Sequence, residues 1–195
     1  MNWDEAVLVL GGTPAPTDLE ERYAEPHRKY HDLTHVRQVV RDAVALTEGR
    51  DRAVVALAAW AHDVVYDGRP GDDERASAAW ARRHLTAVRL AEADVDRVEG
   101  LVLATIDHTA PPGDRVAQAL LDADLGILAA EPADYERYRL AVRAEYAHVT
   151  DDAWRTGRAA VLRSLLAKDP LYLLATHWES AARRNLAAEL AGLER

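Results

Sequence analysis

The sequence contains no cysteine and no phenylalanine, and it has only one methionine. Without cysteine, disulfides, thiolate nucleophiles, zinc fingers and iron–sulfur clusters are all excluded. A metal ion would therefore be bound by histidine nitrogens and carboxylate oxygens, and the chain offers eight histidines. The missing cysteines thus restrict the chemistry of any metal site before its position is known.

Long apolar segments and basic clusters are also missing. The longest uncharged apolar run, Ala53–Ala61, is far shorter than the roughly 18 residues of a membrane span. No basic stretch precedes an apolar run near the N-terminus, so no signal peptide is predicted. The formal net charge of −9 disfavours a nucleic-acid polymer as a partner, because such a partner needs a basic surface. We expect a soluble, cytoplasmic protein without a membrane partner, and a homodimer is compatible with the sequence.

The residues that are abundant favour helices. Alanine, leucine and arginine are frequent and are good helix formers, whereas the alternating pattern of strands is hard to find. The 195 residues suit one domain, 1–195, with a sizeable core. An all-α fold is therefore predicted. Helices are expected at about 3–10, 17–25, 34–46, 51–65, 72–88, 94–108 and 116–129, with three more after 132, after 150 and around 178–186.

Ionisable residues occur in two helices whose pattern predicts burial. The predicted fourth helix is apolar all round and ends with His62-Asp63. The predicted seventh helix carries Asp124 on its apolar face, whereas Asp122 points roughly the other way, as an N-cap or surface residue. Burying a charge costs several kcal/mol unless it is paired or binds a metal. Asp124 therefore needs a partner, either a divalent cation or a buried arginine.

A further histidine precedes these two helices. His35 is expected in the first turn of the third helix, and Thr34 is the predicted N-cap of that helix. The imidazole ring of His35 is expected to face inward. The alternative is an exposed His35, with His31 as the ligand instead. The combined set has two nitrogen and two oxygen donors: His35, His62, Asp63 and Asp124. Such a set suits Mn²⁺, Fe²⁺, Co²⁺, Zn²⁺ or Ni²⁺ better than Ca²⁺, which prefers oxygen ligands alone.

The order of these residues resembles that of the HD-domain metal-dependent phosphohydrolases, and most closely a bacterial subgroup of that superfamily. The strings that carry the resemblance are Tyr30-His31 followed by His35, His62 to Asp67, Asp73 to Ser77, and Gly157-Arg158. The similarity extends from about residue 23 to 190. It implies an HD-type helical bundle whose metal site, between buried central helices, is formed by the four ligands above. It also implies hydrolysis of a small phosphorylated metabolite, such as a nucleotide, by a metal-activated water.

The catalytic acid or base is less clearly marked than the ligands. Asp63 is expected to act in catalysis as well as in metal binding. Tyr66 stands where HD enzymes that hydrolyse guanosine tetraphosphate usually have Glu, and tyrosine, with a pKa near 10, is a poor proton shuttle. Either Asp67 or Glu74 is expected to take this role, or the reaction differs. The alternative for Glu74 is a favourable interaction with its own helix dipole.

Four basic residues are candidates for contact with substrate phosphate. Arg28 and His31 lie close to the predicted His35 ligand, and arginine offers a bidentate fork for phosphate. The similar proteins often have an additional histidine near His108, and Arg158 belongs to the distal Gly-Arg string. The alternatives are a solvated loop for Arg28 and His31, helix capping for His108, and a structural ion pair for Arg158.

Two other functions compete with phosphate-ester hydrolysis. In the first, the helical scaffold holds two irons and performs oxygen chemistry, with His84 and His108 as additional ligands. In the second, the polar cluster is a structural network of a non-catalytic helical binding module. Metal content and the effect of an Asp63 substitution distinguish these alternatives from the hydrolase.

Overall fold

The computed structural model describes residues 1–194, which contain helices and no strand, so the all-α prediction is confirmed. The first part of the chain forms α1 (Trp3–Val9), α2 (Leu19–Tyr23), α3 (Leu33–Ala45), α4 (Asp51–Ala61), α5 (Asp72–Ala87), α6 (Glu92–Leu103) and α7 (Arg115–Asp124). The second part forms the 3-10 helix η1 (Leu125–Ala129), α8 (Pro132–Glu145), α9 (Asp151–Ala167), the 3-10 turn η2 (Thr176–Trp178) and α10 (Glu179–Leu193).

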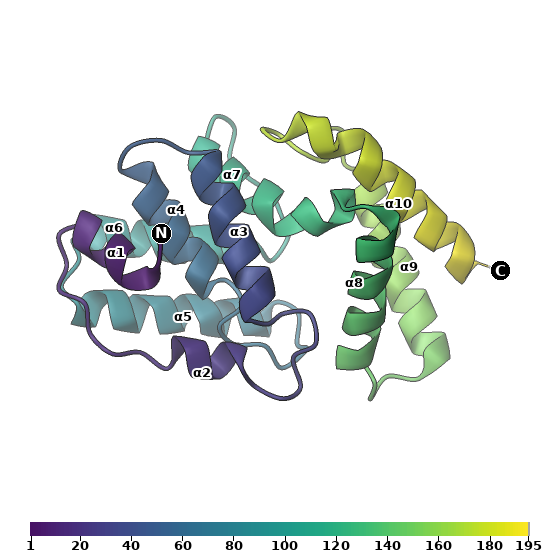
Figure 1. Cartoon of the computed structure of the whole chain (residues 1–195), viewed down its shortest axis with the longest axis horizontal. Helices are drawn as coiled ribbons and strands as arrows, with labels where there is room; N and C mark the ends of the chain where they lie inside the picture. The colour runs from purple at the N-terminus through teal and green to yellow at the C-terminus, as the bar shows by residue number, and fades with distance from the viewer. Residues whose placement is uncertain (195) are drawn as a thin grey trace.

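Helix α4 is the central element of the first part (Figure 1). Every residue from Ala53 to Ala61 is buried, as its uniformly apolar sequence predicts. It packs against α1, α3, α5, α6 and α7, and five of its residues are alanines, whose small side chains permit close helix approach. The mutual contacts of α3, α4 and α7 bring the predicted ligand positions into one region.

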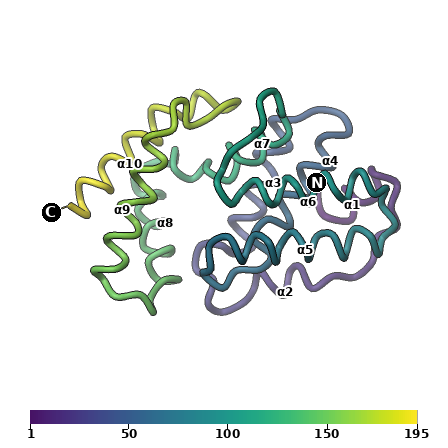
Figure 2. The backbone as a smooth tube through the Cα atoms, turned by 180° about the vertical axis from the view of Figure 1, so that it is seen from behind, coloured from purple at the N-terminus to yellow at the C-terminus, as the bar shows by residue number. Residues whose placement is uncertain are grey.

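The hydrophobic side chains form two separate clusters. The larger one is built from α1 to α7, and the smaller one joins η1 with α8, α9, α10 and the segment before η2. Figures 1 and 2 show the same division from opposite sides, with η1 crossing between the two groups of helices. None of the helices within residues 1–194 is long and apolar enough to cross a membrane.

Four helix boundaries near the predicted site residues differ from the prediction. Helix α4 ends at Ala61 rather than at Val65, because the Val64 N–H bonds to the Ala61 carbonyl oxygen three residues back and the Val65 N–H donates to Oγ of Ser77 at 3.0 Å. The Arg28 guanidinium donates hydrogen bonds to the carbonyl oxygens of Asp63 (2.7 Å) and Val64 (3.1 Å), which have no helical partner in this turn. The His-Asp pair consequently lies at the end of α4 and in the turn that follows.

Helix α3 begins slightly earlier than predicted. Its N-cap is Asp32, not Thr34, because one Asp32 oxygen accepts the backbone N–H groups of both Thr34 (2.7 Å) and His35 (3.2 Å). His35 remains in the first turn, as expected. Helix α6 ends at Leu103 instead of His108, which places His108 in a loop with a positive φ of 51°. The predicted helix over 116–129 changes at Asp124 from α to 3-10 geometry.

The carboxylate of Asp122 connects the two parts of the chain. Its two oxygens accept backbone N–H groups of Leu173, Leu174 and Ala175 at 2.6–3.0 Å, and the residue is only 2% exposed. The prediction of a surface residue or N-cap is wrong, although Asp122 does point away from Asp124. A charge that is buried in this way is stabilised by three backbone donors.

Candidate metal centre

The four predicted metal ligands come together where α3, α4 and α7 meet. His35 lies in the first turn of α3, His62 is the C-cap of α4, Asp63 follows it, and Asp124 is the last residue of α7. The two histidines are almost completely buried, whereas the two aspartates keep part of their surface open, with 17% and 15% of their side chains exposed. The cluster can therefore be reached from the side of its carboxylates.

Three of the side chains are spaced as a metal ion requires. The Nε2 atoms of His35 and His62 are 3.4 Å apart, and each lies 3.4 Å from Oδ1 of Asp124. Their ligand atoms all lie within 4.8 Å of one another. Bonds of about 2.0–2.2 Å to a tetrahedral ion separate neighbouring ligand atoms by about 3.3–3.6 Å. The arrangement of His35, His62 and Asp124 thus fits a divalent cation.

Asp63 lies at the margin of this group. Its Oδ2 atom is 3.1 Å from Nε2 of His62 and 3.6 Å from Nε2 of His35. The carboxylate is near both imidazoles but does not belong to the group whose ligand atoms all lie within 4.8 Å of one another, so its role as a fourth ligand remains a prediction. Its backbone carbonyl, held by Arg28, restricts the turn on which this carboxylate is presented.

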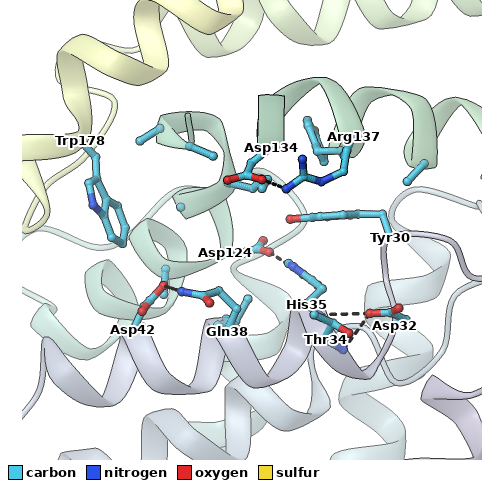
Figure 3. A pocket seen from close by; sticks show the side chains of 18 of the residues that line it. Tyr30, Asp32, Thr34, His35, Gln38, Asp42, Asp124, Asp134, Arg137 and Trp178 are labelled. Carbon is cyan, nitrogen blue, oxygen red and sulfur yellow. Dashed lines mark hydrogen bonds and ion pairs between the residues drawn. The ribbon is translucent and has the colours of Figure 1, made fainter. Parts of the chain in front are cut away.

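Hydrogen bonds behind the ligands hold two of them in orientation. The Nδ1–H of His62 donates to the carbonyl oxygen of Ala59 at 2.7 Å, so its Nε2 atom is directed to the cluster. Oδ2 of Asp124 accepts from Nε2 of His108 at 2.9 Å, which leaves Oδ1 facing His35 and His62. His108 therefore contacts a predicted ligand directly. On the other side of the cluster, Figure 3 shows Tyr30 beside His35, with the Tyr30 hydroxyl pointing toward Asp124.

Opposite charges compensate one another inside the cluster. Burial alone would lower the pKa of His62, but the charges of Asp63 and Asp124 raise it well above its ordinary range. Burial would raise the pKa of each aspartate, yet the His62 charge and the histidine hydrogen bonds lower both pKa values well below the usual range. A metal needs neutral imidazoles, so its binding is expected to release protons.

His31 is oriented by a residue that the sequence analysis missed. Its Nδ1 atom lies 2.7 Å from Oε2 of Glu145, and its ring stacks on Tyr66 with 4.2 Å between ring centroids. Oε1 of Glu145 also accepts the backbone N–H groups of Lys29, Tyr30 and His31 at 2.7–3.0 Å. One signal could have identified it: a glutamate at the C-terminal end of a helix is unfavourable for the helix dipole and needs another partner.

The predicted acid or base candidates occupy different environments. Asp67 is exposed, and its backbone N–H donates to Asp73 at 3.0 Å. Glu74 lines a cavity beside the cluster, and its carboxylate also accepts the Gly71 N–H at 2.6 Å at the start of α5. The structure thus brings Glu74 nearer to the site than Asp67, and the role of a proton shuttle remains a prediction for both.

The predicted phosphate contacts are also distributed unevenly. His31 and His108 line the same cavity as Asp63 and Asp124. Arg28 is buried, and its guanidinium is bound to three backbone carbonyl oxygens and to Glu25. His84, a ligand candidate for the di-iron alternative, stacks on Trp80 with 4.0 Å between ring centroids. A phosphate contact by Arg28 remains a prediction.

Arg158 lies in a buried ion pair, which was the structural alternative for this residue. Its Nε and Nη2 atoms donate to the two oxygens of Glu189 at 2.8 and 3.0 Å, and Nη2 also donates to the Tyr138 hydroxyl at 3.2 Å. Arg158 is 8% exposed and Glu189 is 5% exposed. This pair sets the position of Tyr138, whose ring packs against that of Tyr30 at 4.7 Å.

Removing one member of this ion pair is expected to destabilise the fold. We expect Arg158→Met to lower the free energy of unfolding by about 3 kcal/mol, since Glu189 would stay buried with weaker partners. The double change to Met at Arg158 and Glu189 is expected to cost less, because no unpaired carboxylate remains. Urea unfolding of both variants measures the difference. An unchanged stability together with a raised KM for a phosphate ester would assign Arg158 to the substrate instead.

Two cavities adjoin the cluster from different sides. The α3–α8 cavity (Figure 3) has a volume of about 740 Å³ and is lined by polar residues of α3 and α8 and by apolar residues such as Ile127 and Trp178, with His35 and Asp124 at the cluster. The α8–α9 cavity has a volume of about 520 Å³ and contains Asp63, His108 and Asp124. Both volumes are in the range of small-molecule sites. Asp124 and Tyr138 line both cavities, so the cluster lies where they meet.

Comparisons with protein-family models, with curated proteins and with solved structures found no match to this chain. The resemblance to HD-domain phosphohydrolases therefore remains a prediction from the sequence strings. What the cluster can do chemically follows from its own side chains: two buried imidazoles and at least one carboxylate could hold a metal ion.

Proposed function

We propose that the protein is a metal-dependent phosphohydrolase that cleaves a phosphate ester of a small metabolite. The observation that carries this proposal is the spacing of His35, His62 and Asp124 around one point that is open to two cavities. A divalent cation held there, with Asp63 as a further ligand, supplies an activated water and stabilises charge on phosphoryl oxygens. Mn²⁺, Fe²⁺, Co²⁺, Zn²⁺ and Ni²⁺ suit these mixed nitrogen and oxygen donors.

The remaining residues of the site have separate tasks in this reaction. Asp63 and Asp124 provide the negative charge that holds a cation, and His108 keeps Asp124 oriented through its second oxygen. His31, fixed by Glu145, presents an imidazole to the same cavity. In the hydrolysis, water adds to phosphorus, the bond from phosphorus to the alcohol oxygen breaks, and a proton passes to that oxygen. The products are an alcohol and inorganic phosphate.

The substrate is expected to be a small molecule. The two cavities have small-molecule dimensions, and the net charge of −9 disfavours a long nucleic acid. The helical fold has no glycine-rich phosphate loop within residues 1–194. A cation bound by His35, His62 and Asp124 would therefore be the main binding partner for phosphate. These features support a phosphorylated metabolite as the substrate.

Metal content and phosphate release test the proposal together. We expect the full-length protein, loaded with Mn²⁺ or Co²⁺, to release phosphate from at least one of the following: mononucleotides, guanosine tetraphosphate, sugar phosphates or simple phosphomonoesters. Asp63→Ala is expected to lower kcat at least about 100-fold, because a ligand and a charge are lost. The control is Asp72→Asn, an exposed acidic residue at the start of α5. No bound metal and no release from any ester would contradict the proposal.

A further inference from the structure

The α8–α9 cavity has a polar end and an apolar end. Its polar end contains the carboxylates Asp63 and Asp124 together with His108. Away from the cluster, its walls come from α8, α9 and the loop between them, and they are mainly apolar or aromatic: Val142, Tyr146, Val149, Trp154 and Val161. A ligand with its charged group at the cluster would therefore place its remaining part against hydrocarbon and aromatic rings.

The charged groups of this cavity disfavour a second phosphate. Arg158 is the one arginine or lysine among the described residues that line it, and its guanidinium is bound to Glu189 and Tyr138. Glu74 adds a carboxylate to those of Asp63 and Asp124. The imidazoles of His31 and His108 lie at the cluster end of the cavity, beside His35 and Asp124. Beyond them, a chain of phosphates would meet negative charge and no free guanidinium or ammonium group. An uncharged group has no such penalty.

The aromatic wall is held in place by its own contacts. The ring of Trp154 packs against Tyr146 with 5.4 Å between centroids, and the Arg143 guanidinium lies 5.3 Å from the Trp154 ring. Arg143 in turn donates hydrogen bonds to the backbone carbonyl oxygens of Tyr146 (2.6 Å) and Val149 (3.1 Å). A wall that is ordered before binding loses little conformational freedom when a ligand packs on it.

The α3–α8 cavity has a different character. Away from the cluster it presents the polar side chains of Gln38 and Asp42, which are hydrogen-bonded to each other, and the ion pair of Asp134 with Arg137 (Figure 3). The same cavity also has apolar residues, among them Ile127, Ala141 and Trp178, but an apolar group bound there would pack beside these polar and charged side chains. The part of the α8–α9 cavity formed by Val142, Tyr146, Val149, Trp154 and Val161 lacks such side chains, so it suits the apolar part of a substrate better.

We propose that the α8–α9 cavity binds the alcohol part of a phosphomonoester, and that this alcohol is uncharged and apolar or aromatic. The inference rests on the proposed function, because it assumes that the phosphate lies at the cluster formed by His35, His62 and Asp124. Trp154, Tyr146 and Val161 are then specificity-determining residues. They contact the leaving alcohol, whereas the cluster binds the phosphate that all substrates share.

Binding of two phosphonates tests the assignment without turnover. Phosphonates keep the charged head but have a carbon–phosphorus bond that water does not cleave under these conditions. We expect calorimetry on the Mn²⁺-loaded, full-length protein to give benzylphosphonate a Kd at least about tenfold lower than methylphosphonate. Trp154→Ala is expected to reduce this ratio to about threefold or less, with the Kd of methylphosphonate unchanged.

Two further variants control for folding and for position. Val161→Glu changes an exposed position of α9, so the fold is expected to persist, and its charge at the apolar wall should reduce the ratio in the same way. Trp178→Ala changes a tryptophan of the α3–α8 cavity and is expected to leave the ratio intact. Equal Kd values for the two phosphonates in the unaltered protein would overturn the inference. A ratio that neither Trp154→Ala nor Val161→Glu reduces would do the same.

Turnover separates this inference from the proposed function. If phenyl phosphate is hydrolysed with a KM at least about tenfold below that of methyl phosphate, the hydrolase function and the assignment of the α8–α9 cavity are both supported. If the two esters are hydrolysed with equal KM values, the hydrolase stands and the assignment of the cavity fails. If no ester is hydrolysed but benzylphosphonate binds selectively, the hydrolase fails while the apolar phosphoryl-ligand site stands.

Discussion

Asp124→Asn is expected to weaken Mn²⁺ binding more than about 100-fold and to abolish phosphate release. A loss of about 10–100-fold already follows when only a residue behind a metal ligand is changed, so the loss of a charged ligand should exceed it. The substitution keeps the shape of the side chain but removes the charge that faces His35 and His62 at 3.4 Å. Isothermal titration with Mn²⁺ and a phosphate-release assay measure the two effects.

Asp122→Asn is the matched control for this experiment. It is the same chemical change two residues earlier in α7, at a carboxylate that accepts three backbone N–H groups instead of facing the cluster. We expect Asp122→Asn to cost about 1–3 kcal/mol of stability and to leave the Mn²⁺ affinity within about threefold of the unaltered protein. Equal Mn²⁺ affinities of the unaltered protein and Asp124→Asn would remove Asp124 from the metal site.

The contrast between Asp122 and Asp124 illustrates which part of the site is accessible to sequence analysis. Helical periodicity places Asp124 on an apolar face and Asp122 on the opposite one, because successive residues turn by a constant angle. It also places His35 and His62 on inward-facing positions. Periodicity does not show what packs on the second face of α7. The partners of Asp122 are backbone groups about 50 residues further along the chain, and a local pattern carries no information on them.

The same limit explains the missed residues and the displaced helix ends. Glu145 and Glu189 were not identified because their partners, His31 and Arg158, are distant in the sequence and belong to other elements. The end of α4 was predicted too late because the apolar pattern continues into the turn. The Val65 N–H donates to Ser77 on the next helix instead of continuing α4, and Arg28, on a segment that precedes α4, binds the carbonyl groups of the turn. All-helical content, in contrast, follows from composition and from the lack of the alternating pattern of strands, which are both local properties of the sequence.

The contribution of Glu145 to stability is expected to depend strongly on pH. Burial alone would raise the pKa of Glu145, but hydrogen bonds from His31 and from the Tyr30 and His31 backbone lower it from the ordinary 4.5 to about 2. A depressed pKa stabilises the folded state above the unfolded-state pKa, and this stabilisation disappears as the pH falls through the folded-state value. The contribution, about 3 kcal/mol at pH 7, should therefore be lost between about pH 4.5 and pH 2.

Glu145→Gln tests this dependence directly. At pH 7 the variant is expected to be about 3 kcal/mol less stable to urea than the unaltered protein, and the difference should shrink steadily below pH 4.5. Glu136→Gln is the control, since Glu136 lies on the same helix but is exposed and pairs with Arg139 at the surface. Its effect should stay within about 1 kcal/mol at every pH. A Glu145→Gln difference that does not change between pH 7 and pH 3 would show that its charge does not hold the His31 loop. The Glu145 carboxylate joins α8 to the loop that carries the His31 imidazole, and these contacts are the proposed cause of its orientation. Such a result would therefore require another cause for the orientation of His31.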